Sequence, residues 1–336
     1  MKSVTFKVIV AVAVIVGLGC WTAQAFAGAP RIVKVGIGFN DKMPQYKALE
    51  VFKKEVEAAS QGAYRVDLYH SSQLGDDREM MEALRLGNQE MTCPATAPVA
   101  GFVKEYRVLD LPYLFPSNEV MHKVLNGPPG QELLKKLDSV GLHGLVYLPE
   151  GFRNLTNSRR AVATPADLKG LKIRTMENPI HLAAFRAWGA NPTPMPFGEV
   201  FSAMEQKVVD GQENPTTVPY FGKFYEVQKY YSHTEHFAAP YILMISKKFW
   251  DGIGPADRQV FEAAAQKAYA FHKDYSAKNN AEILEKLKSV MTVTILTPEQ
   301  KQQFFEAAQP VYVQVRKDLG DALVDSFLKA VQAASK

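Results

Sequence analysis

Four residues in the middle of the chain could bind a small anion: Arg153, Arg174, Phe197 and Asn214. The planar guanidinium of arginine can hold a carboxylate or a sulfonate through two charge-assisted hydrogen bonds. Arg174 closes the alternating run 171–174, so we expect it at the carboxyl end of a strand, where open α/β sheets bind ligands. Taken singly, each arginine is more simply explained as a solvated charge or an ion-pair partner. The combination with an aromatic and an amide favours an anion-binding site.

The sequence carries no pattern that predicts catalysis or metal binding. His233 and His236 are the only close histidine pair, but they lie in a predicted strand or loop rather than on a helix. A complete phosphate-binding glycine motif and a nucleophile elbow are both missing, and Cys93 has no obvious histidine partner. We interpret Asp76-Asp77 as an acidic helix start. We therefore expect a binding protein without cofactor, metal or enzymatic activity.

Length and charge restrict the class of protein further. A chain of 336 residues is long for one hydrophobic core, which favours two lobes. The net charge is +4, and it falls to about +2 once two lysines of a removable leader are discounted (39 − 2 basic against 35 acidic residues). This balance does not favour nucleic acid as a partner. We expect a monomer that binds a small organic anion.

Residues 1–27 have the pattern of a secretory signal peptide. A lysine-containing start precedes the apolar run 8–18, which is too short for a comfortable membrane span. Small residues suited to cleavage follow in Ala23-Gln24-Ala25. A lipoprotein signal using Cys20 is the alternative, but Gly17 stands where a lipobox has leucine. We therefore expect export to the periplasm.

The first half of the chain alternates strands and helices. The predicted strands cover 32–38, 64–69 and 90–93, and the predicted helices cover 44–59 and a stretch from the polar turn 71–78 to residue 86. This order favours a parallel α/β sheet. The proline-rich segment 94–117 is predicted as a loop near a lobe boundary. Ser117 begins a further helix, and another covers 131–140.

The second half repeats this style around a long helix. The predicted strands cover 142–148, 171–174, 241–246 and 293–296, and the predicted helices cover 179–188 and 199–207. Helical spacing then persists from Pro255 to about residue 290, about three times the length of an average helix. A helix of this length could run along both lobes. The capping sequence that starts at Thr297 begins a helical C-terminal region.

Five motifs in this order resemble the DctP-type extracytoplasmic solute-binding proteins of TRAP transporters, over roughly residues 31–330. They are SSQLGDD at 71–77, DLKGLKIR at 167–174, NPTPMPFGEV at 191–200, VDGQENP at 209–215 and KFYEVQ at 223–228. Any one of them could be chance, whereas five in the right order are a specific signal.

The resemblance implies roles for individual residues. Arg174 would form the ion pair with the carboxylate of the solute, assisted by Arg153 and Asn214. Phe197 would pack on the solute, and Asp77 would contact it from the opposite lobe. The implied ligand-binding set is completed by Phe39, Asn40 and Glu213.

One departure from the family bears on the ligand. Relatives that bind sialic acid carry a glutamate and an arginine just after the third strand, where this chain reads Cys93-Pro94-Ala95-Thr96-Ala97-Pro98. The resemblance therefore implies a smaller or less polar organic acid rather than sialic acid.

The expected fold class is α/β, a two-lobed periplasmic-binding-protein-like fold with a ligand cleft between the lobes and a long helix spanning both. The first lobe would comprise 28–151 and about 240–279, and the second 152–239 and about 280–336. The expected function is that of a receptor that delivers its ligand to the membrane permease subunits of a TRAP transporter. A ligand-sensing subunit of a signalling system and a secreted enzyme acting on organic acids are the alternatives.

Overall fold

The computed structural model describes residues 29–336, and the predicted signal peptide lies outside the described residues. Nine strands form one mixed sheet in the order β2-β1-β3-β8-β4-β7-β5-β6, with β9 beside β8. The strands are β1 (Arg31–Gly36), β2 (Tyr64–Tyr69), β3 (Met91–Thr92), β4 (Leu142–Asn157), β5 (Lys172–Thr175), β6 (Asn191–Pro194), β7 (Gly211–Pro215), β8 (Tyr230–Ser246) and β9 (Thr292–Ile295).

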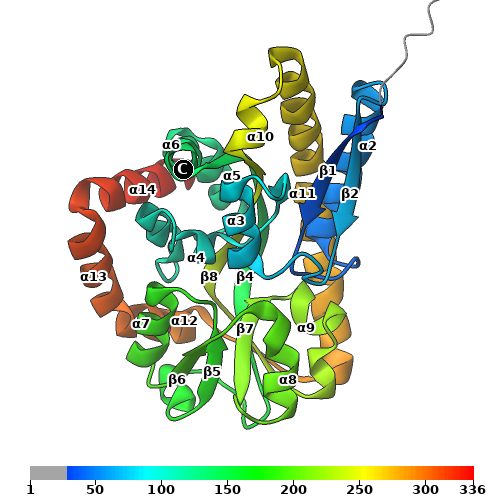
Figure 1. Ribbon diagram of the computed structural model, residues 1–336. Helices are drawn as coiled ribbons and strands as arrows, with labels where there is room; N and C mark the ends of the chain where they lie inside the picture. The colour runs from blue at the N-terminus through cyan, green and yellow to red at the C-terminus, as the bar shows by residue number, and fades with distance from the viewer. Residues whose placement is uncertain (1–28) are drawn as a thin grey trace, which may run out of the picture.

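Helices cover the sheet and divide the molecule into two lobes, seen as its upper and lower halves in Figure 1. The helices of the first lobe are α2 (Pro44–Ala59), α3 (Asp77–Leu86), α4 (Thr96–Val99), α5 (Asn118–Asn126), α6 (Pro128–Lys136) and α10 (Lys247–Asp251). Those of the second lobe are α7 (Pro179–Ala187), α8 (Val200–Glu205), α9 (Thr217–Phe221) and α12 (Pro298–Ala307). The helices α11 (Pro255–Val290) and α13 (Gln309–Leu319) pass between the lobes, and α14 (Asp321–Ala334) ends the chain on the first lobe.

The antiparallel strands β4 and β8 connect the lobes. They pair from Leu142↔Ser246 at one end to Asn157↔Tyr230 at the other, with irregularities near Pro149. The first lobe adds the parallel pair β1 and β2 on one side, and the second adds β5 and β6 on the other. Both connecting strands are longer than the predicted 142–148 and 241–246, because they continue through the irregularities into the second lobe.

The long helix α11 is confirmed with the predicted limits. Its buried residues recur on one stripe, from Phe261 through Ala268 and His272 to Leu287. The stripe packs against α2 and β4 in the first lobe and α9 in the second. Figure 1 shows the helix running the height of the molecule behind the strands. The predicted helix 44–59 is also confirmed.

Two regions differ from the expectations. The segment 94–117, predicted as a loop, contains α4 and a 3-10 helix, η1 (Lys104–Asp110), whose side chains enter the core without a clear helical period. Helix α14 was expected in the second lobe but packs on α5 and α6 of the first, because it buries Val324 and Phe327 there. This packing differs from the predicted assignment of 321–334 to the second lobe.

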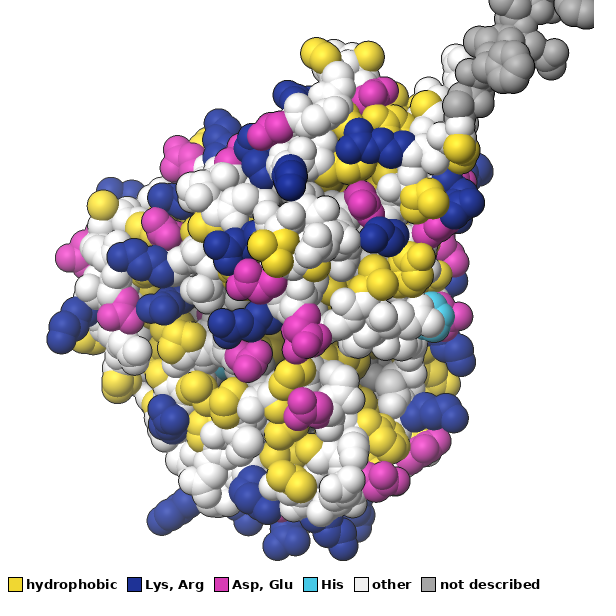
Figure 2. Space-filling model, viewed as in Figure 1, with side chains coloured by type: hydrophobic (Ala, Val, Ile, Leu, Met, Phe, Trp, Pro, Cys, Tyr) yellow, Lys and Arg dark blue, Asp and Glu magenta, His cyan; other side chains and the backbone are white. Residues whose placement is uncertain are grey.

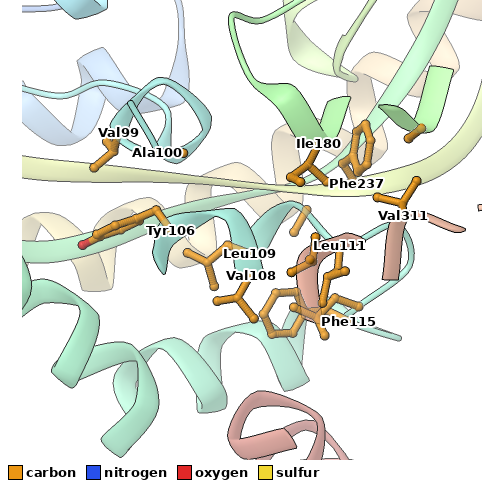
Figure 3. Close-up of a cluster of buried hydrophobic side chains, with 14 of the residues drawn as sticks. Val99, Ala100, Tyr106, Val108, Leu109, Leu111, Phe115, Ile180, Phe237 and Val311 are labelled. Atoms are coloured by element: carbon orange, nitrogen blue, oxygen red, sulfur yellow. The ribbon is translucent and has the colours of Figure 1, made fainter. Parts of the chain in front are cut away.

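The buried apolar side chains of residues 29–336 form three clusters, and the largest of them includes side chains from both lobes. Figure 3 shows part of this cluster, where Leu109 of η1 lies close to Leu111 and Phe115, and Ile180 of α7 lies close to Phe237 of β8. All five side chains are buried. The two lobes therefore share apolar contacts on this side of the molecule.

The visible surface is mixed in charge, with basic and acidic side chains interspersed over most of the face in Figure 2. Among residues 29–336, no helix has both the length and the hydropathy of a membrane span.

Candidate functional site

A pocket that is partly open to solvent lies between the two lobes. The first lobe lines it with Ile37, Gly38, Phe39, Ser72, Asp76, Asp77, Arg78, Cys93, Ala95, Pro98 and Tyr241. The second lobe lines it with Arg174, Met176, Glu177, Met195, Pro196, Phe197 and Asn214. Five of the eight residues predicted to bind the ligand are in this lining: Arg174, Asn214, Phe197, Asp77 and Phe39.

Arg174 is the buried cation of the pocket. Strand alternation turns Ile173 and Arg174 to opposite faces of β5, and only 2% of the Arg174 surface is exposed. Its Nε and Nη2 donate to the carbonyl oxygen of Met195 at 3.0 and 2.7 Å. Within the described part of the chain it forms no ion pair with a carboxylate. A buried cation that lacks a carboxylate partner in the protein can form an ion pair with an anionic ligand.

The charge on Arg174 persists in the pocket. Burial lowers the pKa of its guanidinium to about 10, with the nearby charge of Glu213 opposing and that of Arg153 adding to the shift. A group with this pKa is still protonated at neutral pH.

Asn214 lies beside Arg174 on the neighbouring strand β7. Its Oδ1 accepts a hydrogen bond from Arg153 Nη2 at 3.2 Å, and its Nδ2 donates to Gln212 Oε1 at 2.5 Å. These contacts fix the orientation of the amide at the pocket wall.

Arg153 and Glu213 do not line the pocket, which differs from the expectation. They form a buried ion pair, with Arg153 Nε 2.5 Å and Nη2 2.9 Å from the two carboxylate oxygens of Glu213. Their side chains are 1% and 0% exposed. The carboxylate contacts two nitrogens of the guanidinium and lies outside the lining of the pocket. Arg153 therefore reaches the lining through Asn214, which it positions.

The Arg153–Glu213 pair belongs to a larger buried polar network. His236 Nε2 lies 3.3 Å from Glu213 Oε2. His181 lies between two carboxylates, with its Nδ1 3.6 Å from Glu213 Oε1 and its Nε2 3.1 Å from Asp110 Oδ1. Although burial opposes ionisation, the charge of Arg153 and the histidine hydrogen bonds hold the pKa of Glu213 well below its usual range. Burial acts to lower the pKa of His181, but its two carboxylate partners raise it overall.

The wall from the first lobe carries an aromatic contact and a carboxyl group. Phe39 packs edge-on against Phe197 of the second lobe, with ring centroids 4.7 Å apart, so the lobes touch across the pocket. Asp77 begins α3, and its Oδ2 accepts a hydrogen bond from the Ala95 backbone N–H at 3.3 Å. Burial, the main cause, raises the pKa of Asp77 to about 7.

Asn40 was expected at the ligand but lies outside the lining. Its Nδ2 donates to the Phe221 carbonyl oxygen at 3.0 Å, and its Oδ1 accepts from the Lys42 backbone N–H at 3.1 Å. Because Phe221 ends α9 in the second lobe, this bond joins the two lobes beside the pocket.

Thirteen of the eighteen lining residues were not predicted from the sequence, among them Tyr241 and Cys93. Tyr241 lies on β8 with its hydroxyl buried and without a hydrogen-bond partner among the described residues. Cys93 follows β3 and is buried. Both lie in predicted strands, 90–93 and 241–246, for which no ligand contact was expected. A tyrosine heading the aliphatic run Ile242–Ile245 is the signal that could have indicated a polar function.

The arrangement suits reversible capture of an anion. No group of three or more His, Cys, Asp or Glu within residues 29–336 could hold a metal ion. A ligand enclosed by both lobes could contact the guanidinium of Arg174, the amide of Asn214, the rings of Phe39 and Phe197, and the carboxyl group of Asp77.

A two-lobed α/β fold with a charged pocket between the lobes defines the class of the solute-binding proteins. The family model DctP, bacterial extracellular solute-binding protein, family 7, matches residues 36–318, and the chain belongs to this family. Membership confirms the predicted family and fold, and it places the chain among binding receptors rather than enzymes.

Relatives and solved structures match along nearly the whole chain. The 2,3-diketo-L-gulonate-binding periplasmic protein YiaO of Escherichia coli strain K12 is 33% identical, over 98% of this chain and 95% of its own. The sugar acid binding protein DctPAm of Advenella mimigardefordensis, in complex with galactonate, is 37% identical with a TM-score of 0.89, over 91% of this chain and 99% of its own. A TRAP periplasmic solute-binding protein of Sulfurospirillum deleyianum with bound succinate is 32% identical with a TM-score of 0.85, over 90% and 100%.

Proposed function

We propose that this chain is the periplasmic receptor of a TRAP transporter, which captures a small organic acid and delivers it to the membrane permease subunits. The observation that carries the proposal is the buried guanidinium of Arg174, which lines the pocket and has no carboxylate partner within residues 29–336. The ligands named for the relatives, 2,3-diketo-L-gulonate, galactonate and succinate, are organic acids and support the same class.

Capture depends on contacts from both lobes. Arg174, on the second lobe, pairs with the carboxylate of the ligand. Asp77 and Phe39 contact the ligand from the first lobe. A ligand that bridges the walls binds the closed state more tightly than the open state, and this difference shifts the population towards closure. Closure also excludes water and strengthens the ion pair in the pocket. The closed receptor is the form that we expect the permease to recognise.

Calorimetry with a panel of organic acids tests this function on ligand-free protein. We expect Arg174→Ala to weaken binding by at least about tenfold, because charge-assisted hydrogen bonds contribute about 1.5–3 kcal/mol each. Arg174→Lys keeps the charge but loses the planar fork, so we expect an intermediate affinity. Arg186, an exposed residue of α7, gives the matched control Arg186→Ala, which should bind like the wild type. Unchanged affinity in folded Arg174→Ala would remove Arg174 from the site.

A further inference from the structure

A second buried polar cluster lies on β4, where this strand passes from one lobe to the other. Glu150 is 1% exposed and lies in the irregular part of the β4–β8 pairing, between Pro149 and Phe152. A carboxylate can only accept hydrogen bonds. His272 Nε2 therefore donates to its Oε2 at 3.1 Å, and Thr217 Oγ1 donates to its Oε1 at 2.9 Å. The carboxylate of Glu150 thus joins three elements, β4, α11 and α9, and all three side chains are buried.

Helix α11 holds Glu150 by its side chain and by its backbone. His272 bonds the carboxylate, and Asn280 Nδ2 donates to the carbonyl oxygen of Glu150 at 2.7 Å. The other ring nitrogen of His272, Nδ1, is buried without a hydrogen-bond partner within residues 29–336, so Glu150 is the residue that orients this imidazole. Gly151 follows with a φ of +107°, a conformation that favours glycine. Glu150 is therefore anchored on the helix that runs along both lobes.

Thr217 connects this anchor to the second lobe and to the pocket. It begins α9, three residues after Asn214 of the pocket lining. At the other end of α9, the carbonyl of Phe221 accepts the bond from Asn40 of the first lobe. Figure 1 shows α9 beside the lower half of α11, against which it packs. The segment that carries the pocket amide is thus tied to the hinge at Glu150.

We propose that Glu150, His272 and Thr217 form a hinge latch, in which the bond from Thr217 to Glu150 is made when the lobes close and is lost when they open. The inference rests on the proposed function, in which closure encloses the ligand. In this structure the lobes touch across the pocket and the bond is present. None of the three residues lines the pocket, so they act on affinity through closure and are positioning residues.

The energetic consequence follows from the position of the bond. Glu150 is fixed on α11, whereas Thr217 belongs to the second lobe, so rotation of that lobe about β4 and β8 changes their separation. A contact made only in the closed state shifts the population towards that state. In a receptor that is mostly open without ligand, ligand affinity rises by the same factor, whichever ligand is bound.

Calorimetry on ligand-free full-length protein tests the latch, with galactonate and succinate as probes. Thr217→Val removes the hydroxyl and should weaken binding of both acids by the same factor, about tenfold, because a hydrogen bond to a charged group is lost from the closed state. Thr217→Ser restores the hydroxyl and should bind within about twofold of the wild type. Stopped-flow measurements should assign the loss to faster dissociation, with association within about twofold, because encounter occurs in the open state.

Thr216→Val is the matched control. The hydroxyl of Thr216 is also buried, but its partners Asn154 and Tyr231, at 3.2 and 3.0 Å, lie on the second-lobe parts of β4 and β8. This variant should lower the Tm of ligand-free protein and leave both affinities within about threefold. Thr217→Val should do the opposite, because the latch bond is not made in the open protein. Thr217→Ala lacks the same hydroxyl and keeps the test valid if the valine variant folds poorly.

A second measurement follows closure directly. Spin labels on cysteines introduced at Lys54 of α2 and Glu205 of α8, both exposed, report the distance between the lobes. At the same concentration of either acid, Thr217→Val should show a smaller closed fraction than the wild type, and Thr217→Ser should not.

The contrary results are distinct. Wild-type affinity in folded Thr217→Val, or clearly unequal losses for the two acids, would overturn the latch. A loss of ligand-free stability as large as that of Thr216→Val would also overturn it, because the bond would then be present in the open protein. If neither acid binds the wild type, the proposed function fails, and the ligand-free comparison of the two valine variants still decides the latch.

Discussion

Replacing Glu213 by glutamine tests the buried polar network at the back of the pocket. The substitution preserves size but removes the charge that Arg153 contacts at 2.5 and 2.9 Å, while Arg153 stays 1% exposed. Breaking one partner of a buried ion pair leaves an uncompensated charge and costs about 3–5 kcal/mol. For a domain of this length, that loss lowers Tm by about 5–8 °C.

Thermal and urea unfolding of ligand-free protein measure the effect. Glu119→Gln is the matched control, because Glu119 pairs with Lys123 at 2.8 Å on an exposed helix face. A surface pair of this kind contributes about 0–1 kcal/mol, so this variant should unfold close to the wild type. The double variant Arg153→Met/Glu213→Leu should recover part of the loss because no unpaired charge remains. A loss for Glu213→Gln no larger than that of the control would refute the reasoning.

Three further predictions follow from single contacts. The pKa of Asp77 is raised to about 7, so its contribution to folding stability is fully present at pH values below the ordinary pKa of an aspartate and is lost as the pH rises through about 7. The Tm of the ligand-free wild type should therefore fall relative to that of Asp77→Asn between pH 5.5 and 8.5. Gly211→Ala would place a Cβ 2.1 Å from the Thr156 carbonyl oxygen between paired strands, and should lower the unfolding free energy by about 3 kcal/mol in urea titrations. Asn40→Ala removes the bond to the Phe221 carbonyl and should weaken ligand binding about threefold to tenfold in calorimetry, with ligand preference unchanged.

Each of these predictions has a clear contrary result. A constant Tm difference across the pH range would show that Asp77 titrates normally. Gly254→Ala is the control for Gly211→Ala, because a Cβ at Gly254 meets nothing within 4 Å. Equal stability of the two alanine variants would contradict the steric argument. A change in ligand preference on replacing Asn40 would place that side chain at the ligand rather than at the lobe contact.

The regular helices could be predicted from the sequence because their signals are local. The apolar stripe and Pro44 mark α2, and the same period continued over the whole of α11 between Pro255 and Val290. The long connecting strands could not be predicted in full. Gly151, with φ +107°, and Pro149 resemble the end of a strand, yet pairing with β8 carries β4 through them. That pairing is a long-range property of the sheet.

The pocket was predictable where a motif placed the residue at a strand end, as for Arg174 and Asn214. The pairing of Arg153 with Glu213 depends on the register between β4 and β7, which no local pattern specifies. Tyr241 was missed because an aromatic residue in a buried strand has the same sequence pattern whether its hydroxyl faces the core or a cavity.

The crossings of β4, β8, α11 and the C-terminal helices mean that neither half can be cut from the gene as one uninterrupted piece. A chimera that exchanged ligand preference with a relative would have to transplant at least two separate stretches and keep the irregular pairing near Pro149 intact. Swapping single side chains on the pocket wall is therefore the simpler route to a receptor with altered selectivity.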